Sequence, residues 1–260
     1  MDRRADRPYE RTAAGLAGTP FSKIAFVEET ASTNADAAAL LGSRRDLGTS
    51  IVAEHQTHGS GRKGRRWASQ PGTSLLVTTV LPRSVRAADL WAVPFWVALA
   101  VQRALRVAGV ESALHWPNDL LLDRIGKIAG ILCVSRVTGE AAWVACGVGI
   151  NVHRPAATLG VEPPPAFCDD VAPVDRAALL LELLRAYDAT LDALDDPPHV
   201  AREWERSAGF PGVPYRIEKD GETAAFTCTA IGLAPGGGLV VRRAGGVVET
   251  IALADARALR

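Results

Sequence analysis

The sequence predicts an α+β fold, with a strand-rich core followed by a small all-β domain. Short β-branched and apolar runs, such as residues 73–81, recur before residue 152 and are bounded by turn signals. Longer apolar stretches suited to helices occur at residues 87–108 and 175–194. After Gly209 only short β-rich runs follow, separated by glycine turns, so we place the domain boundary there.

The first half of the chain is expected to supply several core strands. Residues 1–20 are charged and lack hydrophobic periodicity, which predicts a flexible N-terminal arm, too short for a helix-turn-helix DNA-binding domain. Ser32 and Thr33 suit the start of a short Ala-rich helix that ends near Gly42. The expected segments after the arm are strands at 21–27, 50–54 and 73–81, and a Gly- and Arg-rich loop at 55–72.

The second half of the core begins with a long apolar helix over residues 87–108, which Gly109 should end. Pro117 breaks a short strand that ends at Trp116. The segments expected after it are strands at 120–123, 128–137 and 142–152, a Pro-rich loop at 155–173, and helices at 175–194 and 201–208.

The C-terminal residues predict a small β-barrel of about 50 residues. Its expected strands are 215–219, 224–233, 239–243 and 247–252, separated by Asp-Gly and Gly-Gly turn signals. We therefore divide the chain into an arm (1–20), a core domain (21–208) and a C-terminal domain (209–260).

Composition excludes several classes of protein. The 260 residues carry 29 basic and 29 acidic side chains, which argues against binding to nucleic acid or membrane through bulk charge. The longest apolar run, Leu90–Val101, is too short to span a bilayer, and the N-terminus lacks the apolar core of a signal peptide. Four widely spaced cysteines form no CxxC pair. We expect a cytoplasmic protein with buried thiols, no structural zinc, and no nucleic-acid or membrane partner.

The Gly-rich loop contains GxGxxG at Gly59, Gly61 and Gly64. A dinucleotide-binding turn would need a helix here, and a Walker A loop would need Lys-Ser or Lys-Thr after Gly64; neither is present. Glycines let backbone amides approach an anion, and Trp67 offers a flat face to a ring. The four cations of the loop are Arg62, Lys63, Arg65 and Arg66. The loop is therefore either an anion-binding segment or a solvated basic surface loop.

Three further segments have a functional and a structural interpretation. Asn118-Asp119 places an amide and a carboxylate after a Trp-Pro bend, at a site or in an ordinary turn. Lys127 interrupts an apolar strand, so it needs an anionic partner from protein or ligand, unless it lies at an edge in solvent. Glycines at 147 and 149 allow close approach of backbone or ligand, or mark a bulge.

The chain has 25 Arg but only four Lys and three Asn, so Lys and Asn are expected where chemistry resists replacement. Together the segments resemble the biotin protein ligases over residues 24–260. The motifs that carry the resemblance are Ser32-Thr33-Asn34, the loop from Gln56 to Trp67, Trp116 to Asp119, and the strands at 126–132 and 147–152. Two positions depart from the family pattern: Ser60 replaces a loop Arg and His115 replaces a Lys.

The resemblance implies a ligase that joins biotin and ATP into biotinoyl-5′-AMP and pyrophosphate, then acylates a lysine of a biotin carboxyl carrier domain of a carboxylase. It implies a mixed-sheet core related to class II aminoacyl-tRNA synthetases, an SH3-like C-terminal barrel, and the form without a DNA-binding domain. Alternatives are a lipoate or octanoate ligase, which shares the core fold, and a non-catalytic biotin or adenylate sensor.

The resemblance also implies roles for individual residues. Lys127 and Arg62 would act in catalysis, offsetting the repulsion between a carboxylate and a polyphosphate. Biotin would contact Ser32, Thr33, Asn34, Gln56, Ser60, Gly61, Arg62 and Lys127. The nucleotide would contact Arg65, Trp67, Asn118, Asp119 and Asn151. Mg²⁺ accompanying ATP would lie near Asp119, and no transition metal is implied.

Overall fold

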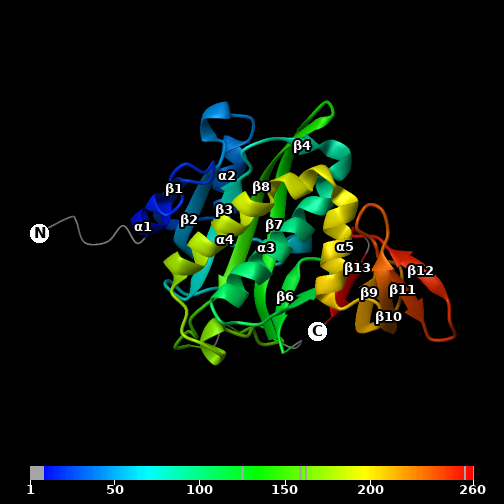
Figure 1. The fold of residues 1–260 in the computed structure, drawn as a ribbon. Coiled ribbons are helices and arrows are strands. Elements are labelled where there is room, and N and C mark those ends of the chain that lie inside the picture. Colours follow the sequence, from blue (N-terminus) through cyan, green and yellow to red (C-terminus); the bar gives the residue numbers. More distant parts are fainter. Residues whose placement is uncertain (1–8, 124–125, 158–159, 162, 255, 260) are drawn as a thin grey trace, which may run out of the picture.

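We describe the fold from a computed structural model, which covers residues 9–123, 126–157, 160–161, 163–254 and 256–259. Its centre is a mixed eight-stranded sheet in the order β1-β2-β3-β8-β7-β6-β5, with β4 pairing β8 (Figure 1). β1 and β2 are parallel, and the other pairs are antiparallel. The strands are β1 (Lys23–Thr30), β2 (Thr49–Gln56), β3 (Ser74–Val80), β4 (Val85–Arg86), β5 (Ala113–His115), β6 (Asp119–Leu122), β7 (Gly126–Thr138) and β8 (Ala141–Asn151).

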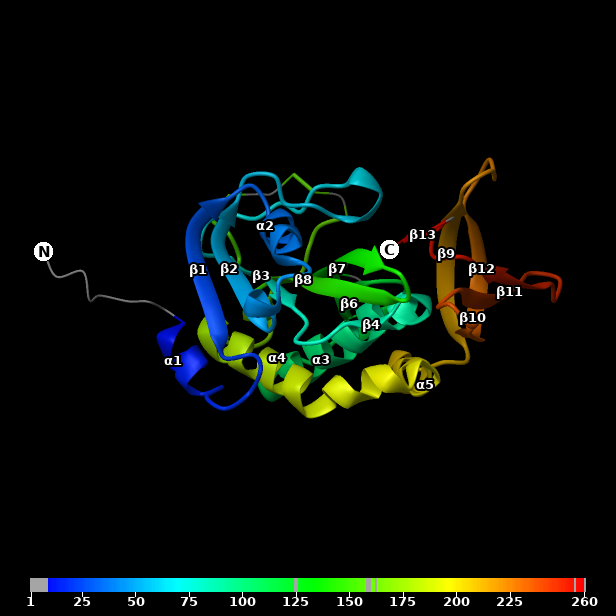
Figure 2. The ribbon, with the colours of Figure 1, turned by 90° about the horizontal axis from the view of Figure 1, so that it is seen from above.

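Helices cover both faces of this sheet. The helices are α1 (Glu10–Ala14), α2 (Thr33–Leu40), α3 (Val93–Val107), α4 (Arg176–Thr190) and α5 (Pro197–Ala208). Short 3₁₀ turns are η1 (Arg44–Asp46), η2 (Arg62–Gly64), η3 (Ala87–Ala92), η4 (Cys168–Asp170) and η5 (Leu191–Asp195). The helices α3, α4 and α5 lie on one face, whereas α2 and the glycine loop lie on the other (Figure 2). The predicted α+β class with a mixed sheet is confirmed.

The helix α3 is the hydrophobic centre of the molecule. Together with η3 it is long and apolar enough to cross a membrane, but most of it is buried against the sheet and α4. Trp96 Nε1 donates to Thr190 O at 2.9 Å, and the Trp96 ring stacks on Tyr187 of α4 at 4.6 Å. Gly109 has φ +82° just beyond the helix, which is the left-handed backbone predicted to end it.

The C-terminal strands form a second, antiparallel sheet in the order β12-β11-β10-β9-β13. They are β9 (Val213–Lys219), β10 (Phe226–Leu233), β11 (Leu239–Arg243), β12 (Val248–Ile251) and β13 (Ala256–Leu259). This sheet packs at one end of the larger sheet, beside α5 (Figure 1). Its buried side chains, such as Tyr215 and Ile217, continue the core of the first domain.

Three expectations from the sequence are wrong in part. Residues 9–20, expected as part of a flexible arm, contain α1, in which Thr12 Oγ1 donates to Ala177 O at 3.0 Å, and Leu16 just beyond α1 is buried. Residues 1–8 lie outside the described residues. The helix expected from residue 201 begins at Pro197, because Asp196 caps it and accepts from His199 N. A fifth strand, β13, was not predicted, because its two alanines are weak strand formers.

Candidate active site

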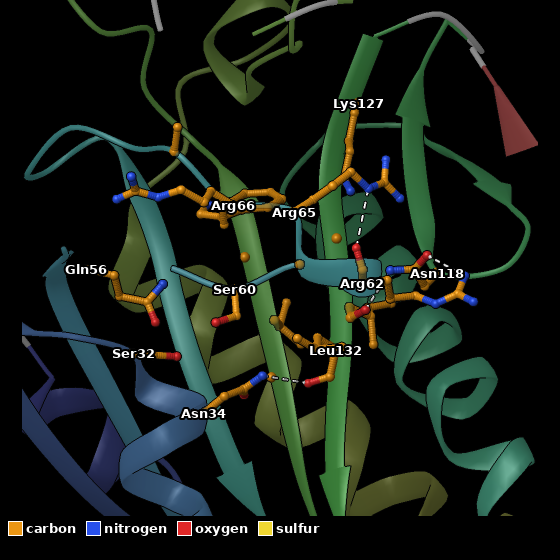
Figure 3. A pocket seen from close by; sticks show the side chains of 18 of the residues that line it. Ser32, Asn34, Gln56, Ser60, Arg62, Arg65, Arg66, Asn118, Lys127 and Leu132 are labelled. Atoms are coloured by element: carbon orange, nitrogen blue, oxygen red, sulfur yellow. Dashed lines mark hydrogen bonds between the residues drawn. The ribbon is translucent and has the colours of Figure 1, made fainter. Parts of the chain in front are cut away.

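A single hollow on the α2 side of the sheet brings the predicted site residues together. Every residue predicted to bind biotin or nucleotide lines it except Asp119, and its empty volume is about 1090 Å³ including its open mouth. The neutral groups Ser32, Asn34 and Gln56 lie at one end, and Arg62, Asn118 and Lys127 lie at the other (Figure 3). The pocket therefore has a mostly uncharged polar end, near which Arg66 donates to Thr57 O, and a cationic end.

Hydrogen bonds fix the uncharged end where α2 begins beside β2 and β3. Gln56 Oε1 accepts from Thr33 N at 2.7 Å and from Thr33 Oγ1 at 3.0 Å. Thr78 Oγ1 lies 2.8 Å from both Thr33 Oγ1 and Asn34 Oδ1, and Asn34 Nδ2 donates to Leu132 O at 3.0 Å. Thr78 was not predicted, although a threonine inside an apolar strand is a signal for such a role.

The cationic end is organised around Lys127. Its Nζ lies 2.6 Å from Asp119 Oδ1 and 5.4 Å from the centroid of the Trp67 ring, and both charged side chains are mostly buried. Asn151 Nδ2 donates to Lys127 O at 3.0 Å, which fixes the strand that carries the lysine. The anionic partner of Lys127 is thus a protein carboxylate, and the interpretation as an edge lysine in solvent is wrong.

Arg62 and Asn118 complete the cationic end. Asn118 Nδ2 donates to Ile131 O at 2.7 Å, and its Oδ1 accepts from Arg62 Nη1 at 3.5 Å. Arg62 Nη2 also donates to Leu253 O, in the turn between β12 and β13. Burial, followed by the nearby Arg65 charge, lowers the pKa of Arg62 from its usual value. Arg62 is therefore partly withdrawn from solvent, whereas Lys63, Arg65 and Arg66 of the same loop remain exposed.

Glycines of β7 and β8 make room for the side chains above them. A Cβ on Gly149 would lie 2.7 Å from Trp67 Cε2, and a Cβ on Gly147 would lie 2.1 Å from Asn34 Oδ1. The register between β7 and β8 runs without interruption, so the bulge interpretation of these glycines is wrong. What approaches these glycines is the protein itself: the side chains of Trp67 and Asn34 and, at Gly147, the backbone oxygen of Leu132; approach of a ligand stays a prediction. Trp67 Nε1 is buried and has no hydrogen-bond partner among the described residues.

The two departures from the family pattern have different surroundings. Ser60 lines the pocket, and its Oγ donates to His58 O at 3.4 Å, within the loop. The His115 ring does not line the pocket; it stacks on Tyr215 of the C-terminal sheet, with centroids 4.7 Å apart and planes 20° apart. The position occupied by His115 therefore contributes to the contact between the two sheets.

Several lining residues were not assigned to the site from the sequence. Ile131, Leu132 and Val148 lie within the motifs at 126–132 and 147–152 and supply apolar walls. Val161, Pro163 and Pro165 come from the Pro-rich segment, which was expected only as a loop and carries no pattern that points to a site. Asp119 lies behind Lys127 and does not line the pocket.

The geometry defines a class of protein before any comparison. A polar pocket beside clustered cations can place a carboxylate against a phosphate, as a carboxylate-activating ligase requires.

Residues 27–151 match the family described as the Biotin/lipoate A/B protein ligase family. The chain is 32% identical to the biotin--[acetyl-CoA-carboxylase] ligase of Mycobacterium tuberculosis over 79% of this chain and 78% of that protein. It is also 32% identical to the enzyme of that name from Paracoccus denitrificans, over 74% and 83%. The chain belongs to the biotin protein ligase family.

A solved structure supports the shared fold. The biotin protein ligase from Aquifex aeolicus in complex with biotin and ATP has a TM-score of 0.73 and 22% identity, and the match covers 92% of this chain and 100% of that one. The similarity therefore includes the C-terminal sheet as well as the core.

Proposed function

We propose that this ligase activates biotin with ATP and transfers it to a lysine of a biotin carboxyl carrier domain. The observation that carries the proposal is the continuity of the two ends of the pocket: a hydrogen-bonded neutral end at Asn34 and Gln56 adjoins the cations Arg62 and Lys127. The neutral end suits the polar ring system of biotin, and the cations suit its carboxylate and the phosphates of ATP.

The residues act by binding and charge compensation. A biotin carboxylate oxygen attacks the α-phosphorus of ATP, the bond to the β-phosphate oxygen breaks, and pyrophosphate leaves. Lys127 and Arg62 offset the repulsion between the reacting anions. The carrier lysine amine then attacks the biotinoyl carbonyl, loses a proton, and displaces AMP. Both steps use substrate groups as nucleophiles.

The remaining site residues are proposed to bind the substrates. Ser32, Thr33, Asn34, Gln56, Ser60 and Gly61 are assigned to biotin, and Arg65, Trp67, Asn118 and Asn151 are assigned to the nucleotide. Among the described residues no cluster of three or more His, Cys, Asp or Glu side chains could hold a metal. Mg²⁺ commonly binds through one or two carboxylates plus substrate phosphates. Asp119, the carboxylate assigned to it, is paired with Lys127 Nζ and does not line the pocket, so it would have to leave that partner to meet a phosphate-bound Mg²⁺. Bound with ATP, Mg²⁺ would neutralise phosphate charge.

The finer features of the fold, the location of the protein and its partner are also proposals. A fifth strand that returns to pair with β9 is compatible with an SH3-like barrel. The mixed core would be related to class II aminoacyl-tRNA synthetases, and the domain boundary would lie at residue 209. The site of action would be the cytoplasm, with a carboxylase carrier domain as partner and neither nucleic acid nor membrane bound.

The test is ATP–pyrophosphate exchange measured with biotin and, separately, with lipoate. We expect exchange that depends on biotin, followed by labelling of a carrier domain. Exchange that occurs with lipoate but not with biotin would make the chain a lipoate ligase. Binding of biotin without any exchange would make it a non-catalytic sensor.

A further inference from the structure

The C-terminal sheet supplies hydrogen-bond acceptors to the cationic end of the pocket. Tyr215 Oη accepts from Trp116 N at 3.0 Å, and Gly237 O accepts from Trp116 Nε1 at 3.0 Å. Leu253 O accepts from Arg62. These three acceptors lie on β9, in the turn between β10 and β11, and in the segment between β12 and β13. Both donor residues belong to the segments that form the cationic end.

Trp116 links the C-terminal part of the chain to the segment that carries Asn118. Its side chain is fully buried, so both of its N–H groups need protein partners. Pro117 follows and has no N–H, which makes Trp116 N the last backbone donor before Asn118. Asn118 then bonds Arg62, and Asp119 bonds Lys127. The backbone N–H that the Tyr215 hydroxyl binds therefore lies two residues before Asn118, which lines the pocket.

The Tyr215 ring is itself held in place. It stacks on His115 and meets the edge of Phe210 at 6.2 Å, with an angle of 82° between the planes. Its side chain is almost completely buried. A ring packed on two sides presents its hydroxyl in one position, so Trp116 meets an acceptor that needs little further ordering.

We propose that Tyr215 is a positioning residue for the nucleotide half of the site, acting through Trp116 on Asn118 and Asp119. The assignment of that half to ATP rests on the proposed function. Without the hydroxyl, Trp116 N is left buried and unpaired, which loosens the segment that leads to Asn118. The neutral end of the pocket is built from α2, β2 and β3 and does not depend on this bond.

The experiment compares Tyr215→Phe with Tyr187→Phe, which removes the same atom from an equally buried ring. The Tyr187 hydroxyl has no hydrogen-bond partner among the described residues, and its ring packs on Trp96, away from the pocket. In biotin-dependent exchange, Tyr215→Phe should raise KM for ATP ~5–30-fold and change KM for biotin less than ~2-fold. KM does not depend on the amount of folded enzyme, so partial unfolding leaves this result readable. Tyr187→Phe should leave both KM values unchanged.

Amide hydrogen exchange gives a readout independent of activity. Without ligand, Tyr215→Phe should speed exchange in residues 113–122 but not in α4, whereas Tyr187→Phe should leave residues 113–122 unchanged. Equal KM values for ATP and unchanged exchange in 113–122 would overturn the proposal. Uniformly faster exchange or loss of the fold would also overturn it, because the hydroxyl would then serve stability alone. Absence of pyrophosphate exchange in the unmodified chain would refute the proposed function, and the amide exchange would still decide the role of Tyr215.

Discussion

Lys127 Nζ lies 2.6 Å from Asp119 Oδ1, across the antiparallel pair formed by β7 and β6. The two side chains are 20% and 15% exposed, so the ion pair is largely shielded from water. Charges interact more strongly in such a site than they do in water. A ligand phosphate or carboxylate approaching Lys127 meets a cation already fixed by its partner. This arrangement costs little reorganisation when the anion arrives, which is the condition for strong electrostatic stabilisation.

Replacement of this lysine tests that role. We expect Lys127→Ala to retain the fold and to slow biotin-dependent pyrophosphate exchange ~10²–10³-fold, the usual scale for removing one preorganised charge donor. The matched control is Lys219→Ala, since Lys219 forms a similar pair with Glu249 in the C-terminal sheet, 2.7 Å apart. Exchange at the unmodified rate in folded Lys127→Ala would remove the lysine from the mechanism.

The sequence predicted the composition of the site but not this relationship. Lys127 was expected to need an anionic partner, and Asp119 was expected near the metal. Their contact depends on the pairing of β6 with β7, which contains a register shift after Leu120. Register depends on tertiary packing, and a one-residue slip would send each side chain to the other face. Hydrophobic periodicity therefore identified the strands but left the pair undetermined.

The contacts between the two sheets could not be predicted from the sequence either. The strand pattern after Gly209 predicted four strands and their turns, and all four are present. Nothing in that pattern shows that Leu253 O accepts from Arg62 or that Tyr215 reaches Trp116, because these bonds join residues far apart in the sequence. Local propensity carries no information about such pairs.

The glycines of β8 allow the two ends of the pocket to be tested separately. Gly149→Ala places a methyl group against Trp67. Gly147→Ala places one against Asn34 Oδ1 and also 2.7 Å from the backbone oxygen of Leu132 on β7, so retention of the fold is checked first for this variant. Because overpacking displaces the facing side chain, we expect Gly149→Ala to raise KM for ATP about 10-fold and Gly147→Ala to raise KM for biotin by a similar factor. Each variant is the control for the other. The assignment of Trp67 to nucleotide and Asn34 to biotin is wrong if the two effects are reversed or identical.

The buried thiol of Cys168 predicts a loss of stability in alkali. Burial, with a smaller contribution from Asp169, raises the pKa of Cys168 from 9.0 to about 12. The folded state favours the protonated thiol, so this stabilisation is complete below pH 9 and is lost as pH rises towards 12. Between pH 9 and 11 the free energy of unfolding should fall, through this group, by ~1.4 kcal/mol per pH unit.

Chemical denaturation at several pH values checks this expectation. Cys168→Ala should lower stability below pH 9, because it leaves a cavity, but its free energy of unfolding should fall less steeply above pH 9. Below pH 8 the two proteins should show parallel pH dependence. Parallel curves above pH 9 as well would show that Cys168 does not contribute to the alkaline loss.

The glycine loop gives the last prediction. Residues 56–72 carry four cations, and several of their bonds lie within the loop, such as Gly61 N to Arg65 O at 2.6 Å and Trp67 N to Gly59 O at 2.8 Å. The ion pair from Lys63 to Asp220 is exposed and contributes little. Like charges repel and glycines lose much entropy on ordering, so opening of the loop should require little free energy without ligand. A bound adenylate would supply an anion for the arginines and a ring for Trp67, and closure would protect the mixed anhydride from water.

Hydrogen exchange with and without substrates measures this directly. With biotin and ATP together at about 100 times their dissociation constants, exchange across residues 56–72 should slow by up to ~100-fold, because the ligands bind only the closed loop. Peptides from the C-terminal sheet beyond Gly209 should change much less, and α4 serves as the internal control. Biotin alone should give partial protection, since the arginines would still lack the phosphate. If the loop is equally protected with and without ligands, it is preformed and does not order on binding, although the assignment as a ligase would stand.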